Sequence, residues 1–168
     1  KTTLMERLTS HLDRTPFDPA TDPLHCVPAH DVLRYKVYGG TEELDGVPQD
    51  ILGAELGVRR AQFGGTDALP ASIIEKAIPW VQGRPYPLIL GEGARLANVR
   101  FLTAAADAGY TVHLACLDHD KVAEWRAERS EKLGKIQSPA WVKGRETATR
   151  NLMEHFVKKQ KPLVKTYF

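Results

Sequence analysis

The feature that most constrains the fold is a strand, helix, strand pattern in the middle of the chain. The apolar run 86–90 ends at Gly91-Glu92-Gly93 and predicts a short buried strand. An amphipathic helix is expected over 94–108, closed by Gly109, and a second strand over 110–117. Strands that alternate with helices pair in parallel, so the pattern predicts an α/β fold with a parallel sheet.

The chain before this pattern is less regular. Leucines at spacings of four predict a helix over 2–14. A loose alternation of apolar and polar residues predicts a strand over 32–38. Repeated turn signals over 39–70 indicate an irregular insertion on the substrate side, with a short helix at 49–56. A helix with proline near its first turn is expected over 71–81.

The chain after the pattern is richer in charge. A charged helix is expected over 121–133, a loop over 134–143, an amphipathic helix over 146–158 and a last strand over 163–168. The length of 168 residues fits one domain with its own core, so the sequence predicts a single domain over 1–168.

Composition narrows the class of protein. Apolar residues make up 42% and charged residues 26% of the chain, and no apolar run approaches the length that spans a bilayer. We therefore expect no membrane partner. Cys26 and Cys116 are far apart in sequence, so we also expect a cytoplasmic protein. The net charge of +2 does not demand a nucleic acid, although basic residues gather from Arg126 to Lys165. The oligomeric state is left open.

The first residues match the end of a phosphate-binding loop. Such a loop reads G-x-x-x-x-G-K-[ST], and Lys1-Thr2 fits its last two positions, followed by Thr3 and an amphipathic helix. The lysine of such a loop binds the β- and γ-phosphates of a nucleotide and the hydroxyl binds magnesium. The competing interpretation is a common tripeptide at a frayed terminus.

Two carboxylates are candidates for chemistry. Glu92 follows a strand at the sheet edge where α/β proteins bind ligands, and it could hold magnesium or orient a nucleophile. Alternatively it is a solvated residue paired with Arg95. Asp67 follows Gly64-Gly65-Thr66, where the backbone can approach a ligand and the aspartate could accept a proton from a hydroxyl. Alternatively Asp67 only caps the helix that begins near Pro70.

Basic residues in the second half are candidates for a mobile lid over 126–146. Guanidinium groups that a lid delivers can stabilise the charge of a transferring phosphoryl group. The candidates are Arg126, Arg129, Lys143 and Arg145. The alternative is a solvated helix face whose arginines are neutralised by Glu124, Glu128 and Glu131.

Two groups of histidine and cysteine do not predict a zinc site. His113 and Cys116 are three residues apart, which in a strand places their side chains on opposite faces. His119 comes after the end of the expected strand. The group His25, Cys26 and His30 lies in a proline-rich segment without a second ligand pair.

Several short segments resemble the small P-loop kinases of the nucleoside and nucleotide kinase type, and more closely bacteriophage-encoded kinases of the 5-hydroxymethyluracil-DNA-kinase type. Besides Lys1 to Leu4, the similar segments are Phe63-Gly64-Gly65-Thr66-Asp67-Ala68-Leu69, Leu90-Gly91-Glu92-Gly93-Ala94-Arg95-Leu96-Ala97-Asn98 and Trp141-Val142-Lys143-Gly144-Arg145-Glu146-Thr147. The resemblance implies a three-layer P-loop kinase fold with a parallel sheet. We therefore expect a first strand and the P-loop glycines to be missing before Lys1, so that the domain is N-terminally incomplete.

The resemblance also implies roles for these residues, with ATP and Mg²⁺ as cofactors. Lys1, Thr2 and Thr3 would bind the nucleotide, Thr2 and Glu92 the metal. Asp67 would be the base, with Glu92 beside the metal and Arg126, Arg129 and Arg145 as lid cations. The substrate would contact Gly65, Thr66, Arg95 and Lys143.

Three functional hypotheses follow. The first is an ATP-dependent kinase with an alcohol acceptor, for example a hydroxymethylated pyrimidine in phage DNA, a nucleoside or a nucleotide, acting in the host cytoplasm if phage-encoded. The second is a non-catalytic nucleotide- or nucleic-acid-binding module. It predicts salt-sensitive DNA binding that survives loss of Asp67 and Glu92. The third is a small-molecule kinase without a nucleic-acid partner.

Overall fold

A computed structural model gives the fold as two compact units, residues 1–104 and 105–168, and the boundary falls within one helix. The residues that the structure describes are 2–17, 28–35, 51–58, 64–116, 120–134, 136–159 and 163–167.

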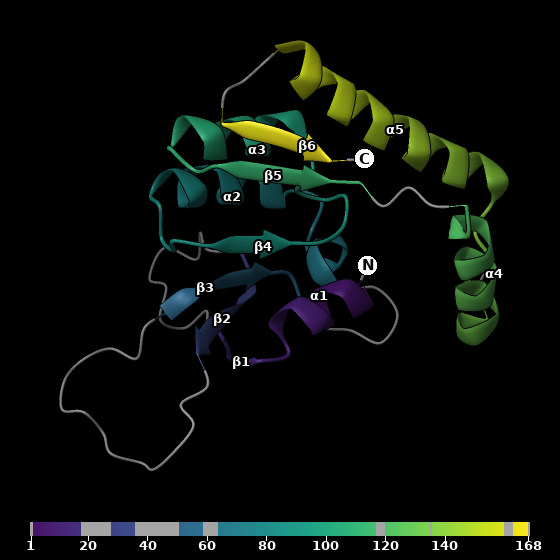
Figure 1. The fold of residues 1–168 in the computed structure, drawn as a ribbon, viewed down its shortest axis with the longest axis horizontal. Helices are drawn as coiled ribbons and strands as arrows, with labels where there is room; N and C mark the ends of the chain where they lie inside the picture. Colours follow the sequence, from purple (N-terminus) through teal and green to yellow (C-terminus); the bar gives the residue numbers. More distant parts are fainter. Residues whose placement is uncertain are drawn as a thin grey trace. The chain divides into compact units, whose positions relative to one another are not determined.

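The first unit is built on a four-stranded sheet of order β1-β2-β3-β4 (Figure 1). The strands are β1 (Leu12–Pro16), β2 (His30–Tyr35), β3 (Ile51–Leu56) and β4 (Ile89–Gly91). The pairs β1·β2 and β2·β3 are antiparallel, whereas β3·β4 is parallel. The prediction of a parallel sheet is therefore correct for β3·β4 and wrong for β1 and β2.

The helices of this unit are α1 (Thr2–Thr9), the short 3₁₀ helix η2 (Gly65–Ala68), α2 (Ile73–Gln82) and most of α3 (Val99–Asp107). The core of the unit includes apolar side chains from β2, β3 and α2. Its most deeply buried members are Leu33, Ala54, Leu56, Ala77 and Val81.

The predicted helix over 2–14 is wrong in its second half. The helix ends at Thr9, and Leu12 is buried at the start of β1, opposite Tyr35 of β2. Leu8 is exposed, so it does not lie on a buried face of the helix. Pairing with β2 overrides the helical spacing, because it buries Leu12 and satisfies the backbone of 12–16.

The short helix predicted over 49–56 is also wrong, because 51–56 form strand β3 between β2 and β4. Ala54 and Leu56 are buried two residues apart, which is the period of a strand. Gly53 is required by close packing, since a Cβ atom there would lie 2.3 Å from the carbonyl oxygen of Leu88. The segment expected to be an irregular insertion thus contributes a strand to the middle of the sheet.

Helix α2 confirms the prediction for 71–81 within two residues, whereas α3 begins later than expected. The backbone N–H of Phe101 donates to the side-chain oxygen of Asn98 at 3.0 Å, so Asn98 caps the helix. Residues 94–98 therefore form the loop that follows β4. Gly109 closes α3 with a φ of 91°, as predicted.

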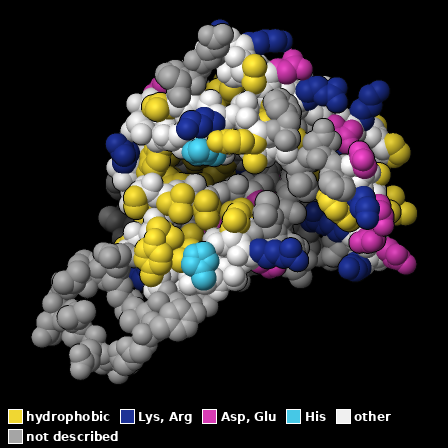
Figure 2. Space-filling view, viewed as in Figure 1, with side chains coloured by type: hydrophobic (Ala, Val, Ile, Leu, Met, Phe, Trp, Pro, Cys, Tyr) yellow, Lys and Arg dark blue, Asp and Glu magenta, His cyan; other side chains and the backbone are white. Residues whose placement is uncertain are grey.

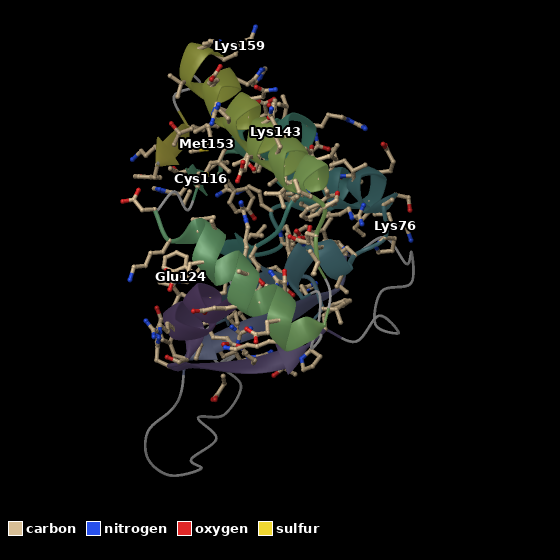
Figure 3. The ribbon with its side chains drawn as sticks, turned by 90° about the vertical axis from the view of Figure 1, so that its right-hand side faces the viewer. Lys76, Cys116, Glu124, Lys143, Met153 and Lys159 are labelled. Carbon is tan, nitrogen blue, oxygen red and sulfur yellow. The ribbon has the colours of Figure 1, made fainter. Side chains whose placement is uncertain are left out.

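The second unit contains β5 (Val112–Ala115), α4 (Val122–Leu133), α5 (Pro139–Lys159) and β6 (Val164–Tyr167). Strands β5 and β6 pair in parallel as a separate sheet, which confirms both predicted strands. Helix α5 contacts β6 through its second half, where Met153 and Phe156 are buried (Figures 1 and 3). Gly134 ends α4 in the left-handed conformation.

The predicted loop over 134–143 is wrong beyond residue 138. The backbone N–H of Trp141 donates to the hydroxyl of Ser138, and Pro139 takes the first helical position. Serine followed by proline is a helix-start signal, because proline lacks the N–H that a first turn leaves unbonded. Lys143 therefore lies on a helix (Figure 3). None of the helices in the described part of the chain is long and apolar enough to cross a bilayer.

Candidate active site

Two loops leave the same edge of the first sheet and lie against each other. Strands β3 and β4 are parallel, with Leu56 beside Gly91, so their carboxyl ends coincide. The chain after β3 leads to η2, and the chain after β4 leads to Glu92 and Gly93. This is the edge at which open parallel sheets bind their ligands.

Thr66 joins the two loops. Its backbone N–H and its hydroxyl both donate to the carbonyl oxygen of Glu92, each across 2.8 Å. Thr66 is 2% exposed. Two donors on one carbonyl oxygen hold the backbone from which the Glu92 side chain extends.

Glycines allow this close approach. A Cβ atom on Gly65 would lie 2.5 Å from Cγ of Glu92, and one on Gly93 would lie 2.8 Å from both Oγ1 of Thr66 and Cγ of Asp67. Both glycines have positive φ, 64° and 107°. A side chain at either position would meet a steric barrier and backbone strain.

The two candidate carboxylates come from these loops. Asp67 is exposed, and its Oδ1 accepts a hydrogen bond of 2.8 Å from the backbone N–H of Ala94, in the loop after β4. Glu92 is half-buried, with Oε2 inaccessible to solvent. The pair thus combines one carboxylate at the surface with one carboxylate that extends into the protein.

Asp67 does not cap α2, so that alternative is wrong. The capping position of α2 is Ser72, and Asp67 lies in the first turn of η2. The structure therefore brings together Gly65, Thr66, Asp67 and Glu92, with the exposed Arg95 three residues further on. Their chemical roles remain predictions.

The nucleotide-binding residues are only partly described. Lys1 lies outside the described residues. Thr2 and Thr3 form the start of α1, as expected for residues that follow a P-loop lysine, but their side chains are not described.

The predicted lid cations lie on α4 and α5 of the second unit. Nη1 of Arg126 is 2.5 Å from Oε1 of Glu146, so an ion pair connects the two helices. The guanidinium of Arg145 lies 5.9 Å from the ring centroid of Trp141, one turn earlier on α5. Arg129 and Lys143 are exposed. The predicted neutralisation by Glu124, Glu128 and Glu131 is not what holds Arg126, because its ion-pair partner is on the other helix.

A cluster of aromatic rings around His30 was not predicted. His30 is buried at the start of β2, stacked on Phe17 at 4.6 Å and flanked by Trp80 and Tyr86. Its Nδ1 donates to the carbonyl of Pro28 at 2.7 Å, which leaves Nε2 to accept from the Tyr86 hydroxyl at 3.0 Å. Burial lowers the pKa of His30 and raises that of Tyr86. The partners are distant in sequence, so no local pattern signals the cluster.

The candidate site offers two carboxylates for metal binding. The described residues contain no group of three histidine, cysteine, aspartate or glutamate side chains arranged to hold a metal ion. Mg²⁺ in kinases needs one or two carboxylates, since phosphate oxygens and water supply its other ligands. Glu92, with Asp67 on the adjacent loop, is a donor set of that kind. His119, His25 and Cys26 lie outside the described residues.

Comparison with known proteins identifies one family. The model of the P-loop Nucleotide Kinase3 family matches residues 1–167, which is nearly the whole chain. No curated protein and no solved structure matches the chain. Kinases of this kind generally use ATP and Mg²⁺, and the match indicates phosphoryl transfer involving nucleotides in general.

Proposed function

The chain belongs to the P-loop Nucleotide Kinase3 family, and from this premise we propose that it is an ATP-dependent kinase whose acceptor is an alcohol. The observation that carries the proposal is the junction of the two loops. Thr66 ties η2 to Glu92, and Ala94 holds Asp67, at the carboxyl end of parallel strands. Family membership supplies the reaction class, and this junction supplies the candidate catalytic groups.

Asp67 suits the role of base. Its Oδ1 is held by the N–H of Ala94, which orients the carboxylate while the side chain stays exposed. An oriented carboxylate can accept the proton of an acceptor hydroxyl as the oxygen attacks the γ-phosphorus. The new bond joins the acceptor oxygen to phosphorus, the bond from the γ-phosphorus to the β,γ-bridging oxygen breaks, and ADP leaves with the electron pair.

Glu92 suits a role beside Mg²⁺, which neutralises phosphate charge when bound. Its backbone is fixed by Thr66 and its side chain is half-buried, so the carboxylate is held rather than free to rotate into solvent. Lys1, Thr2 and Thr3 are proposed to contact the nucleotide, and Gly65, Thr66, Arg95 and Lys143 the acceptor. Arg126, Arg129 and Arg145 are proposed as cations that stabilise the transferring group.

The acceptor is proposed to be a nucleoside, a nucleotide or a hydroxymethylated pyrimidine within DNA. Screening these three classes with γ-labelled ATP and Mg²⁺ measures the proposed activity. Asp67→Asn and Glu92→Gln should each lower the rate of transfer by about 10²-fold or more, because each removes a charged group from the reacting site.

The matched control is Glu75→Gln, which alters an exposed carboxylate on α2 that pairs with Arg100. It should leave the rate unchanged. Urea unfolding of each variant separates loss of chemistry from loss of folding. If both variants fold and transfer phosphate at the rate of the unsubstituted protein, the proposed roles of Asp67 and Glu92 are wrong. Absence of transfer to every acceptor, together with DNA binding that survives Asp67→Asn and Glu92→Gln, would instead favour the non-catalytic module.

A further inference from the structure

The buried His30 lies at the edge of the first sheet from which the two loops of the candidate site leave. It stands opposite Leu56, the last residue of β3, and Leu56 stands opposite Gly91, the last residue of β4. The loops that carry Asp67 and Glu92 follow these two strands. His30 therefore shares an edge of the sheet with both carboxylates, although the proposed function gives it no role.

The ring of His30 holds the backbone on its N-terminal side. Its Nδ1 donates to the carbonyl oxygen of Pro28 at 2.7 Å, which closes a tight turn around Ala29. Its Nε2 accepts from the hydroxyl of Tyr86 at 3.0 Å, and its ring stacks on Phe17, the residue after β1. The turn is thus attached to a neighbouring strand and to the chain that leads into β4.

Ala29 connects this turn to the loop after β3. Its carbonyl oxygen accepts a hydrogen bond of 2.8 Å from the backbone N–H of Gly57, the first residue beyond β3. Gly57 has a φ of 117° and packs against Gly65, since a Cβ atom on Gly57 would clash with the carbonyl group of Gly65. The N–H of Val58 donates to the same carbonyl oxygen at 3.3 Å. These contacts set the position of the start of η2.

The start of η2 in turn holds both candidate carboxylates. Thr66, the second residue of η2, donates twice to the carbonyl oxygen of Glu92. Asp67 comes next and accepts from the N–H of Ala94. A continuous series of contacts therefore runs from the ring of His30 to the two loops of the candidate site.

We propose that His30 is a positioning residue for the candidate active site: its neutral ring holds the backbone that anchors Gly57, and thereby the loops that carry Asp67 and Glu92. The inference rests on the proposed function, because it takes these loops to perform phosphoryl transfer. A small displacement of catalytic groups lowers the rate of a reaction strongly. Loss of the contacts of His30 should therefore lower kcat and leave the KM for ATP nearly unchanged.

Protonation of His30 should release this hold. A proton on Nε2 removes the acceptor of the Tyr86 hydroxyl, because an imidazolium ring has no acceptor nitrogen. It also leaves a positive ring among the side chains of Phe17, Trp80 and Tyr86. The loops of the candidate site should then become more mobile.

The pH of this change follows from the surroundings of the ring. Figure 2 shows mainly hydrophobic side chains over the strands of the first sheet, at the left of the view. Among the described residues, two charged groups act on the cluster: Asp31, which favours the proton on His30, and Arg34, which acts on Tyr86. Burial outweighs Asp31 and lowers the pKa of His30 below its ordinary value of 6.5. The folded protein should therefore take up this proton only below pH 6.5.

Amide hydrogen exchange measured by NMR on the full chain tests the link without an acceptor. In His30→Phe at pH 7, the backbone N–H groups of Gly57 and Thr66 should exchange about tenfold faster, because the hydrogen bonds that protect them open more often. The N–H of Ala54, which donates to Leu88 in the same sheet, is the reference and should change less than about twofold. A general loss of stability would instead raise all three rates by one factor.

Tyr86→Phe is the milder variant, because it removes one hydrogen bond of His30 and keeps the packed ring. It should accelerate exchange at Thr66 by a smaller factor than His30→Phe does. Tyr35→Phe makes the same change at an exposed position on β2 and should leave exchange at Thr66 unaltered.

The pH profile distinguishes positioning from packing alone. In the unsubstituted protein, the ratio of the exchange rates of Thr66 and Ala54, corrected for the intrinsic pH dependence of exchange, should rise as the pH falls below 6.5. In His30→Phe the ratio should not change with pH, because phenylalanine binds no proton. A ratio that is flat in the unsubstituted protein, or equal acceleration at Gly57, Thr66 and Ala54 in the variant, overturns the proposal.

A transfer assay with γ-labelled ATP separates this inference from the proposed function. His30→Phe should lower kcat about tenfold or more without a matching change in the KM for ATP. If exchange responds as expected and no acceptor is phosphorylated, the kinase function fails and the positioning of the two loops by His30 is supported. If Asp67→Asn abolishes transfer while His30→Phe keeps the original kcat and exchange rates, the kinase function stands and the role of His30 is wrong.

Discussion

Thr66 and Glu92 are joined by two hydrogen bonds on one carbonyl oxygen, each 2.8 Å long, one from the backbone and one from the side chain of Thr66. The bond from the backbone N–H would survive any substitution of Thr66 except one to proline. The hydroxyl bond depends on the side chain alone, so its contribution can be removed without breaking the junction of the two loops.

Thr66→Val keeps the shape of the buried side chain and removes the hydroxyl. We expect the free energy of unfolding to fall by about 1 kcal/mol, the usual net value of one hydrogen bond. Phosphoryl transfer should fall by a larger factor than this loss of stability explains, because Glu92 is no longer held in one position. Urea unfolding and a transfer assay measure the two effects.

Thr66→Ser is the control for activity. It retains the hydroxyl and loses the methyl group, which lies 3.5 Å from the point where a Cβ atom on Gly91 would stand. Transfer by the serine variant should therefore exceed that of the valine variant even if both lose stability. Equal transfer by the two would mean that the hydroxyl bond does not position Glu92.

Gly93 should not tolerate alanine. Its φ of 107° strains any other residue, and the added Cβ would lie 2.8 Å from Oγ1 of Thr66. We expect Gly93→Ala to lower the free energy of unfolding by about 1–3 kcal/mol. Gly144→Ala on α5 is the matched control, because a Cβ there meets nothing within 4 Å. That variant should gain about 0.5–1 kcal/mol, since alanine favours a helix.

Arg14 lies between two carboxylates of neighbouring strands. Its guanidinium is 3.4 Å from Asp31 and 2.5 Å from Glu55, which are directly opposite each other on β2 and β3. Arg14→Met would leave these like charges facing each other with little solvent. We expect a loss near the lower end of about 3–5 kcal/mol, because the side chains are 14–20% exposed rather than fully buried.

Added salt should recover part of that loss by screening the two carboxylates. The control is Arg100→Met, which breaks an exposed pair with Glu75 and should leave the unfolding midpoint unchanged. If both arginine variants unfold at the same urea concentration, the Arg14 cluster does not stabilise the sheet.

The sequence predicts elements well where the signal is local. Gly109 and Gly134 end α3 and α4, because glycine readily adopts the positive φ that a helix end needs. The elements β5, β6 and α2 follow from apolar residues that recur with the period of a strand or of a helix. The proximity of Asp67 and Glu92 depends on strand β3, which the sequence predicts as a helix. The two residues lie together because the loops after the parallel strands β3 and β4 leave the same edge of the sheet. Their catalytic roles remain predictions that mutation must test.

The errors arise where distant partners decide the structure. Leu12 joins a strand because Tyr35 pairs with it, and 51–56 form a strand because β2 and β4 lie on either side. His30 gathers Phe17, Trp80 and Tyr86 from separate elements. The start of α5 is different, because Ser138 and Pro139 carried a local signal that the neighbouring glycine and lysine residues obscured.

His30 predicts how stability depends on pH. Burial lowers its pKa below the ordinary value of 6.5, so the unfolded chain binds a proton more readily than the folded protein does. The stabilisation from neutral His30 is therefore complete above pH 6.5 and is lost as the pH falls through the lowered pKa. Urea unfolding at a series of pH values should show the free energy of unfolding declining on the acid side.

His30→Phe isolates this contribution from the carboxylates that also titrate in acid. The variant loses the hydrogen bonds to Pro28 and Tyr86, so it should be less stable than the unsubstituted protein at pH 8. Its decline between pH 7 and pH 5 should be shallower, because phenylalanine binds no proton. His113→Phe, at an exposed position on β5, should keep the original slope. An equally steep decline in His30→Phe would show that another group sets the acid limit of stability.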